Sequence, residues 1–221
     1  MTPFEILVRA APAFLRGLRT TLVVWSMSCV VGTATGILLG WFLYRTERST
    51  RLVRVTVNAI PELLKTVPLL VLLIWFHYLL PSYLGVDVSP LVTATVVFAL
   101  IVMVGVGEIV RSAISNLPRG ELEAGHAIGL APSEVGRFIA LPLAFRAASP
   151  ALTLLYIDML KFSTLASVIA LEELLHVTDT VIARTYVAVP AYTALALIFI
   201  VMILPLNWAA RRYAGRINVI R

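Results

Sequence analysis

The sequence predicts an all-α integral membrane protein with five transmembrane helices and one long polar loop. Of the 221 residues, 60% are hydrophobic and only 14% are charged, whereas soluble domains average about 45–50% apolar and about 25% charged residues. The apolar residues form five nearly uninterrupted stretches, each close to the ~20 residues that a helix needs to cross a bilayer. The Arg residues collect in alternate connecting segments, which is typical of a multi-span protein.

The five apolar stretches cover more than half of the chain and leave no room for a second globular unit. We therefore interpret residues 1–221 as a single membrane domain. The first, second and fifth stretches contain no Asp, Glu, Lys or Arg, and the fourth contains only Asp158 and Lys161. The predicted spans are 20–44, 66–86, 88–110, 147–171 and 188–210, with a loop at 111–146 between the third and the fourth.

The distribution of positive charge predicts the orientation of these spans. Arg and Lys residues follow the first, third and fifth spans, whereas the other two connecting segments carry only Arg184. Because cytoplasmic loops are enriched in Lys and Arg, this alternation places the 111–146 loop and the C-terminus in the cytoplasm and the N-terminus outside. Arg9, Arg16 and Arg19 oppose this orientation, but three loops outweigh one terminus. The same placement of charge argues against nucleic acid as a partner, despite the net charge of +6.

Two features near the start of the chain each allow two interpretations. Residues 1–19 mix apolar side chains with Arg and Glu, which fits an amphipathic helix lying in the outer interface or an ordered tail. Gly32, Gly36 and Gly40 lie four residues apart, so they share one face of the first span and let a neighbouring backbone approach closely. That neighbour is a second subunit or, as we favour, another helix of the same chain.

Prolines mark the second span and the 111–146 loop. Pro61 and Pro68 lie near the start of the second span, and because each lacks a backbone donor we expect a bend or break there. The loop is expected to form two short helices joined at residues 131–133, the second of which stops at Pro142. Two short amphipathic helices on a rigid frame suit a groove in another protein.

The loop also contains a set of small, acidic and apolar residues at fixed spacing. Glu123, Ala124 and Gly125 are followed after three residues by Gly129, and after nine more by Ile139-x-Leu141-Pro142. This spacing resembles the cytoplasmic EAA loop of ATP-binding-cassette importer permeases, whose pattern is E-A-A-x3-G-x9-I-x-L-P. Gly125 in place of Ala is the one departure, and it exchanges one small residue for another.

The resemblance extends over most of the chain from about Gly17 and points to the polar amino acid branch of that family. GLRTTLVV (17–24) is similar to the start of the branch's first span. LLKTVPLLVLL (63–73) is similar to its R-G-T-P-L-L-V-Q-L, with Lys65 and Val67 in place of Arg and Thr. EIVRSAISNLPRGELEAG (108–125) is similar to E-x2-R-x6-P-x-G-Q-x-E-A-A, with Glu121 for Gln. MLKFSTLASVI (159–169) is similar to L-L-K-D-T-S-L-x-S-x-I, but Phe162 replaces the usual Asp, which leaves the exact substrate open.

The resemblance implies a permease subunit of a type I importer in a bacterial inner membrane, driven by ATP that another chain hydrolyses. The sequence has no G-x4-G-K-[ST] loop, so ATP and Mg are expected in a partner ATPase, and neither a cofactor nor enzymatic activity is expected in this chain. The other implied partners are a second permease subunit, identical or related, a periplasmic or lipid-anchored solute-binding protein, a polar amino acid and membrane lipid. The residues expected to couple the permease to the ATPase are Glu121, Glu123, Ala124, Gly125, Gly129, Ile139, Leu141 and Pro142.

Ionisable residues within the spans are candidates for the solute pathway, because charge inside a bilayer is costly and usually faces a cavity. Asp158 and Lys161 lie three residues apart and either bind the charged ends of a zwitterion or pair with each other. Lys65 either contacts solute or extends to the inner interface. Glu108 and Arg111 are expected to brace the inner end of the third span. The predicted pathway residues are Glu62, Lys65, Thr66, Asp158, Lys161, Ser163 and Thr164.

The remaining chemistry-bearing residues indicate no metal site, because Cys29 is the one cysteine and His77, His126 and His176 are scattered. Two rival functions stay open at this point. The first is a proton- or sodium-coupled carrier using Asp158 and Lys161, although the chain lacks the internal repeats on which many such carriers are built. The second is a membrane scaffold that transports nothing and recruits a cytoplasmic protein through its loop.

Overall fold

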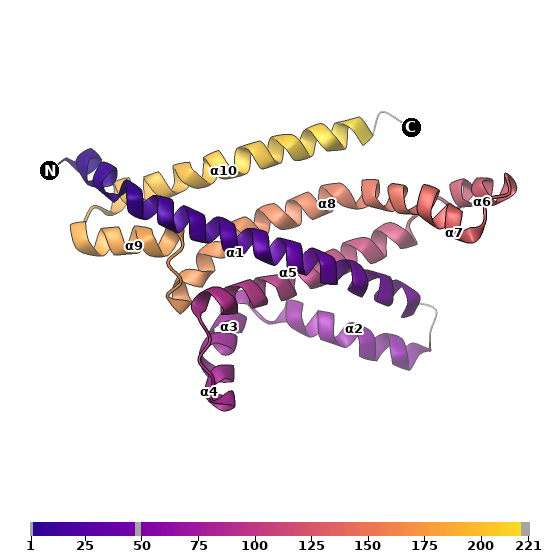
Figure 1. Ribbon diagram of the computed structural model, residues 1–221, viewed down its shortest axis with the longest axis horizontal. Helices are drawn as coiled ribbons and strands as arrows, with labels where there is room; N and C mark the ends of the chain where they lie inside the picture. Colours follow the sequence, from indigo (N-terminus) through magenta and orange to yellow (C-terminus); the bar gives the residue numbers. More distant parts are fainter. Residues whose placement is uncertain (1, 47–49, 218–221) are drawn as a thin grey trace.

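The computed structural model describes residues 2–46 and 50–217, and all regular structure in these ranges is helical. Four long helices cross the molecule side by side (Figure 1). They are α1 (Pro3–Thr46), α5 (Pro90–Ser115), α8 (Leu141–Phe162) and α10 (Ala188–Ile217). Each contributes a helical segment long and apolar enough to cross a membrane, as predicted for the first, third, fourth and fifth spans. Arg48 and Arg221, two of the cations used to predict the orientation, lie outside the described residues.

The three glycines of the first span form the contact between α1 and α5. A Cβ atom built on Gly32, Gly36 or Gly40 would lie 2.6–2.7 Å from the nearest atoms of α5, backbone carbonyl oxygens among them. Only glycine permits this approach of two backbones. The preferred interpretation, packing within the same chain, is therefore confirmed.

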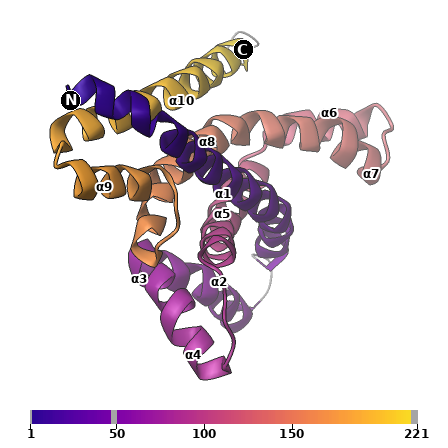
Figure 2. The same cartoon turned by 60° about the vertical axis from the view of Figure 1, so that its left-hand side comes forward.

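The N-terminal residues continue α1 without a break, so they form neither a separate interfacial helix nor a tail. Phe14 is buried against Leu174, Val177 and Leu195 of α9 (Leu174–Thr185) and α10. The backbone N–H of Leu174 donates to the Thr21 hydroxyl at 3.2 Å. The N-terminal part of α1 therefore packs against α9, at the end of the molecule where the N-terminus lies (Figure 2).

The second predicted span, 66–86, is a broken helix. After α2 (Arg51–Thr66), the chain turns by 95° and continues as α3 (Leu69–Ile74), a π-helical turn (Trp75–Leu79) and α4 (Leu80–Leu84). The break falls at Val67-Pro68, as proline chemistry predicts, because Val67 is extended and Pro68 opens α3. Pro61, by contrast, lies inside α2 without ending it. Within the described residues, the candidate spans therefore number four single helices, or five if the bent pair crosses as one.

The main core lies where α1, α3, α5 and the 3-10 helix Ser163–Ile169 meet. Its buried members are apolar residues of all four elements, with Leu73, Ala94, Ala166 and Ile169 fully inaccessible. The ends of α1 and α10 and the start of α2 lie at the same end of the bundle as α6 (Arg119–Ala127) and α7 (Pro132–Val135) (Figure 1). All the connections predicted to be cytoplasmic thus lie at one end, which we call the loop end.

Candidate coupling loop and solute pathway

The first half of the loop is a short helix, α6, that packs closely on the second half. Gly125 is buried, and a Cβ atom there would lie 2.6 Å from Ile139 Cδ1 and 3.1 Å from Val135 Cγ2. Glu121, in the first turn, suits the positive end of the helix dipole. Glu121, Glu123 and Ala124 are all exposed. The acidic residues of the motif therefore face outwards while Gly125 and Ile139 hold the two halves together.

Gly129 ends α6 with a sharp reversal. Its φ of 89° is left-handed, a region that glycine occupies at no steric cost. The N–H of Leu130 donates to the Gly125 carbonyl at 3.2 Å, and the N–H of Gly129 donates to the His126 carbonyl at 3.0 Å. This pair of bonds is a Schellman motif. Gly129 therefore supplies a sharp bend directly after α6.

The sequence predicts that the second loop helix stops at Pro142, but in the structure this helix continues past Pro142. Helix α7 begins at Pro132 and continues through a π-helical turn (Gly136–Ala140) into α8. A proline inside a helix removes one hydrogen bond and collides with the carbonyl four residues earlier, and the wider π turn just before Pro142 accommodates both effects. The expected stop at Pro142 is wrong, and the loop is rigidly continuous with the fourth span.

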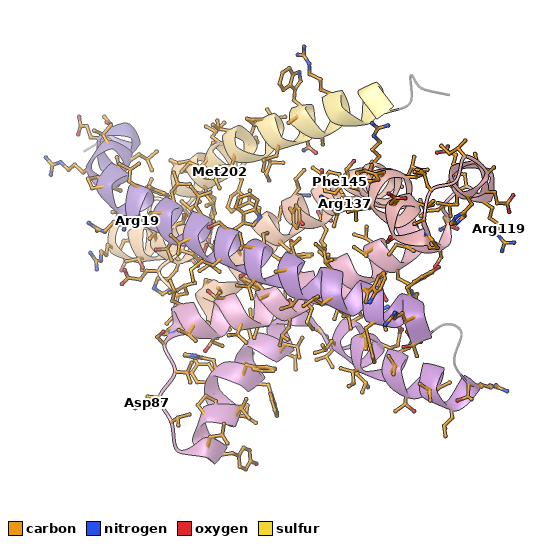
Figure 3. The ribbon with its side chains drawn as sticks, turned by 45° about the vertical axis from the view of Figure 1, so that its right-hand side comes forward. Arg19, Asp87, Arg119, Arg137, Phe145 and Met202 are labelled. Atoms are coloured by element: carbon orange, nitrogen blue, oxygen red, sulfur yellow. The ribbon has the colours of Figure 1, made fainter. Side chains whose placement is uncertain are left out.

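The loop presents an apolar surface that nothing in the described chain covers. Phe138 of the π-helical turn is followed at helical spacing by Leu141 and Phe145 at the start of α8, and Ile128 directly follows α6. Arg119 and Arg137 lie at the same end (Figure 3). An exposed apolar patch with charged neighbours marks a protein-binding surface. The exposed fractions are 77% for Ile128, 63% for Phe138, 65% for Leu141 and 69% for Phe145.

Asp158 and Lys161 pair with each other within the fourth span. Lys161 Nζ lies 3.0 Å from Asp158 Oδ1, and their side chains are 52% and 41% exposed. Ser163 is buried and its hydroxyl donates to the Leu160 carbonyl, while the Thr164 hydroxyl donates to the Lys161 carbonyl. The ion pair thus faces outwards from the single chain, and the two hydroxyls stabilise the end of α8.

The second predicted group, Glu62, Lys65 and Thr66, lies on α2 just before the bend. Lys65 Nζ contacts Glu108 Oε1 of α5 at 2.7 Å and Glu62 Oε2 at 3.0 Å. The Thr66 hydroxyl donates to the Glu62 carbonyl within the helix. Glu108 therefore joins α5 to α2. Arg111 makes a parallel link, a 3.4 Å bond to Asn58 Oδ1 of α2.

Comparison with known proteins decides the family. The family described as "Binding-protein-dependent transport system inner membrane component" matches residues 32–219. This chain belongs to that family. By the description of its family, the permease is the inner membrane component of a transport system.

Several curated relatives cover most of the permease. It is 30% identical over 195 residues to the "Probable amino-acid ABC transporter permease protein YckA" of Bacillus subtilis, covering 88% of this chain and 84% of the relative. It is 27% identical over 212 residues to the "Glutamine transport system permease protein GlnP" of Escherichia coli, covering 96% of this chain and 95% of that protein.

Solved structures confirm the fold. The "Crystal structure of an amino acid ABC transporter with histidines" contains a chain with a TM-score of 0.86, 24% identity, and coverage of 98% of this permease and 99% of that chain. A chain of the MetNI methionine ABC transporter in an inward-facing conformation has a TM-score of 0.73 at 22% identity, covering 92% and 95%. The type I importer permease fold predicted from the sequence is therefore correct.

Sequence reasoning missed a buried acid, Glu173, next to α9. Its carboxylate caps the helix by accepting from the N–H groups of Leu175 at 2.9 Å and His176 at 2.8 Å. Burial raises the pKa of Glu173 to about 7, against the lowering effect of these two bonds. The sequence gave no clear signal for this cap, because the usual N-cap residues are Ser, Thr, Asp and Asn.

The sequence also gave no sign of the contacts that fix α8 against α1. Trp25 Nε1 donates to the Tyr156 carbonyl at 2.8 Å, and the hydroxyls of Thr33 and Tyr156 are 2.7 Å apart. Tyr156 is two residues before Asp158, so these bonds position the part of α8 that carries the ion pair. Such contacts join residues more than 120 positions apart, and no local pattern signals them.

Proposed function

We propose that this permease forms the solute pathway of an ATP-driven importer of polar amino acids and receives its driving force through the 121–142 loop. The observation that carries the proposal is the rigid loop with its uncovered apolar surface. Gly125 and Gly129 fix the fold of the two loop helices, and the π turn joins the second of them, α7, directly to α8. A push on the loop would therefore be passed to the helix that carries Asp158 and Lys161.

The ion pair supports a pathway role for this face of α8. A charged side chain at the bilayer centre costs roughly 2.5–3.5 kcal/mol on insertion scales, so such residues face a bundle interior or a water-filled cavity. Asp158 and Lys161 are half exposed in the single chain. We infer that a second permease subunit completes an enclosed pathway around them, where they meet the ammonium and carboxylate groups of the solute.

The partners follow from the same proposal. A cytoplasmic ATPase binds ATP and Mg and docks on the loop, and a solute-binding protein delivers the amino acid from the outside. The relatives named for glutamine, arginine and cystine transport support a polar amino acid as the solute. Phe162 occupies the position of an acidic residue in the branch pattern, so we expect a neutral side chain on the solute rather than a cationic one.

Reconstitution tests this function directly. The permease is assembled in nanodiscs with its candidate ATPase, and ATP turnover is measured with a binding protein that carries L-glutamine, L-arginine or L-histidine. The proposal predicts turnover that rises only when the binding protein is loaded with its solute. Uptake into vesicles driven by an imposed proton gradient without any ATPase would contradict it and favour an ion-coupled carrier.

A further inference from the structure

A hollow of about 350 Å³ lies between α5 and α8, closer to the loop end than the Asp158–Lys161 pair. Its volume is at the lower end of the roughly 300–1,000 Å³ of small-molecule sites. Three polar residues of α5 line it at helical spacing, so they share one face. The lining consists of Glu108, Ile109, Ser112, Ala113, Asn116, Ala147, Ala148 and Ala151.

The α8 wall of this hollow is made of alanines, and this explains why space remains. Ala147, Ala148 and Ala151 carry a single methyl group each, where leucine or phenylalanine would fill the gap between the helices. On the α5 side, the Asn116 amide donates to the Ser112 carbonyl at 2.8 Å and reaches its hydroxyl at 3.2 Å. The side-chain carbonyl of Asn116 remains to accept a further bond.

One of the lining residues, Glu108, belongs to a pair of opposite charges. Glu108 contacts Lys65 of α2 at 2.7 Å, with side-chain exposures of 35% and 40%. A zwitterionic amino acid carries the same two charges. Its ammonium group can take the place of Lys65 at Glu108, and its carboxylate can bind Lys65, so the pair can open around the solute without leaving either charge unpaired.

The position of the hollow along α5 and α8 suits a second binding site for a solute that moves towards the loop end. Along α8, Asp158 lies seven residues beyond Ala151, which corresponds to about 10 Å. Glu108 lies seven residues before the end of α5 at Ser115, again about 10 Å. The hollow therefore lies between the Asp158–Lys161 pair and the loop end.

We propose that the α5–α8 hollow, with Glu108 in its lining and Lys65 paired to Glu108, is a second binding site for the zwitterionic solute on its way to the loop end. This inference rests on the proposed function, since it presumes that the solute is an amino acid. Glu108 and Lys65 bind the ammonium and carboxylate groups, and the alanine wall admits the side chain. Glu108 is thus a solute-binding residue as well as a brace between α5 and α2.

Equilibrium binding to the permease–ATPase complex in nanodiscs tests the second site. Tritium-labelled L-glutamine, L-arginine and L-histidine are the probes, and the binding protein is left out. The wild type is expected to bind two molecules of the transported amino acid per permease chain. Ala151→Leu, which fills the hollow, is expected to remove one of them, and Glu108→Gln to weaken it at least tenfold. Ala196→Leu, on the exposed surface of α10, is the matched control and should change nothing.

The outcomes separate the two proposals. If Ala151→Leu and Glu108→Gln both retain wild-type stoichiometry and affinity, the second site is overturned while the proposed function stands. If the wild-type complex binds none of the three probes and none stimulates its ATP turnover, the proposed function itself fails. Size-exclusion profiles show whether Ala151→Leu still assembles, and if it does not, Glu108→Gln decides the question because glutamine has the shape of glutamate and adds no bulk between α5 and α8.

Discussion

Substitution of Gly129 tests the coupling proposal most directly. Its φ of 89° is left-handed, and a Cβ atom there would touch nothing within 4 Å. Replacement by Val therefore acts through backbone strain alone, about 1–2 kcal/mol, which lowers the ratio of the native bend to other backbone conformations by roughly five- to thirtyfold. We expect Gly129→Val to reduce solute-stimulated ATP turnover in the reconstituted complex, by at most this factor.

A matched control for this change lies in the same short helix. Gly120 also has open space around its Cβ position, but its φ is not left-handed. Gly120→Val adds the same side chain to α6 without the strain, and we expect turnover close to wild type. Equal turnover in both variants would show that the bend at Gly129 plays no part in coupling.

Glu173 should make the stability of the permease depend on pH. Its pKa is about 7 when folded, against an ordinary value of 4.5. Because the folded state holds this proton more tightly, the associated stability is fully present below about pH 4.5 and is lost as pH rises through about 7. The shift corresponds to about 3 kcal/mol. Glu173→Gln should therefore flatten the fall in thermal midpoint between pH 5 and 8, measured in detergent, while Glu172→Gln at the exposed neighbouring position should not.

At the scale of elements, replacing a glycine by alanine should have different effects where the glycine contacts backbone and where it contacts side chains. Gly36→Ala places a Cβ 2.7 Å from the Met103 carbonyl of α5, and neither backbone can yield. We expect a loss of about 1–3 kcal/mol, as for other overpacked cores. Gly125→Ala meets only side-chain atoms, Ile139 Cδ1 at 2.6 Å and Val135 Cγ2 at 3.1 Å, and the end of the Ile139 side chain can rotate away. Its thermal midpoint should stay near wild type, and equal losses in both variants would contradict this account.

The spans could be predicted because each depends on one local property, a run of apolar residues. The bent second span shows the limit of that signal. Pro68 indicated a break, but α2 carries Arg51, Glu62 and Lys65, so hydropathy placed the span only after residue 66. The polar face of α2 is stabilised by Glu108 and Arg111 of α5, 43 and 53 positions away from their partners. No spacing rule reveals a contact of that separation.

The loop was predictable for a different reason. Its motif encodes its own geometry, since Gly129 supplies the bend and Gly125 the close approach to Ile139. Pro142 was misinterpreted because the rule that proline ends a helix ignores a π turn placed before it. The α5–α8 hollow could not be predicted, because the three alanines that line it indicate, from the sequence alone, only that this segment favours a helix.

At the scale of the whole molecule, the polar contacts form a sequence along the bundle. The Asp158–Lys161 pair lies farthest from the loop end, the Lys65–Glu108 pair lies nearer to it, and the exposed apolar surface of the loop lies at the loop end itself. Helix α8 contributes to the first and the last of these and lines the hollow between them. A movement of the loop along α8 would thus alter all three at once, which is the geometry that coupling requires.

The orientation of this sequence of sites in the membrane is the last prediction. The alternation of cations places the loop end in the cytoplasm, and Trp41 with Arg45 and Trp208 with Arg212 lie near that end of α1 and α10, as aromatic and basic residues do at a membrane interface. In a Cys29→Ala background, a membrane-impermeant maleimide should label Glu172→Cys in spheroplasts, and Gly120→Cys only after the membrane is opened. Labelling of Gly120→Cys in intact spheroplasts would place the loop on the wrong side for any cytoplasmic ATPase, and import driven through it would be excluded.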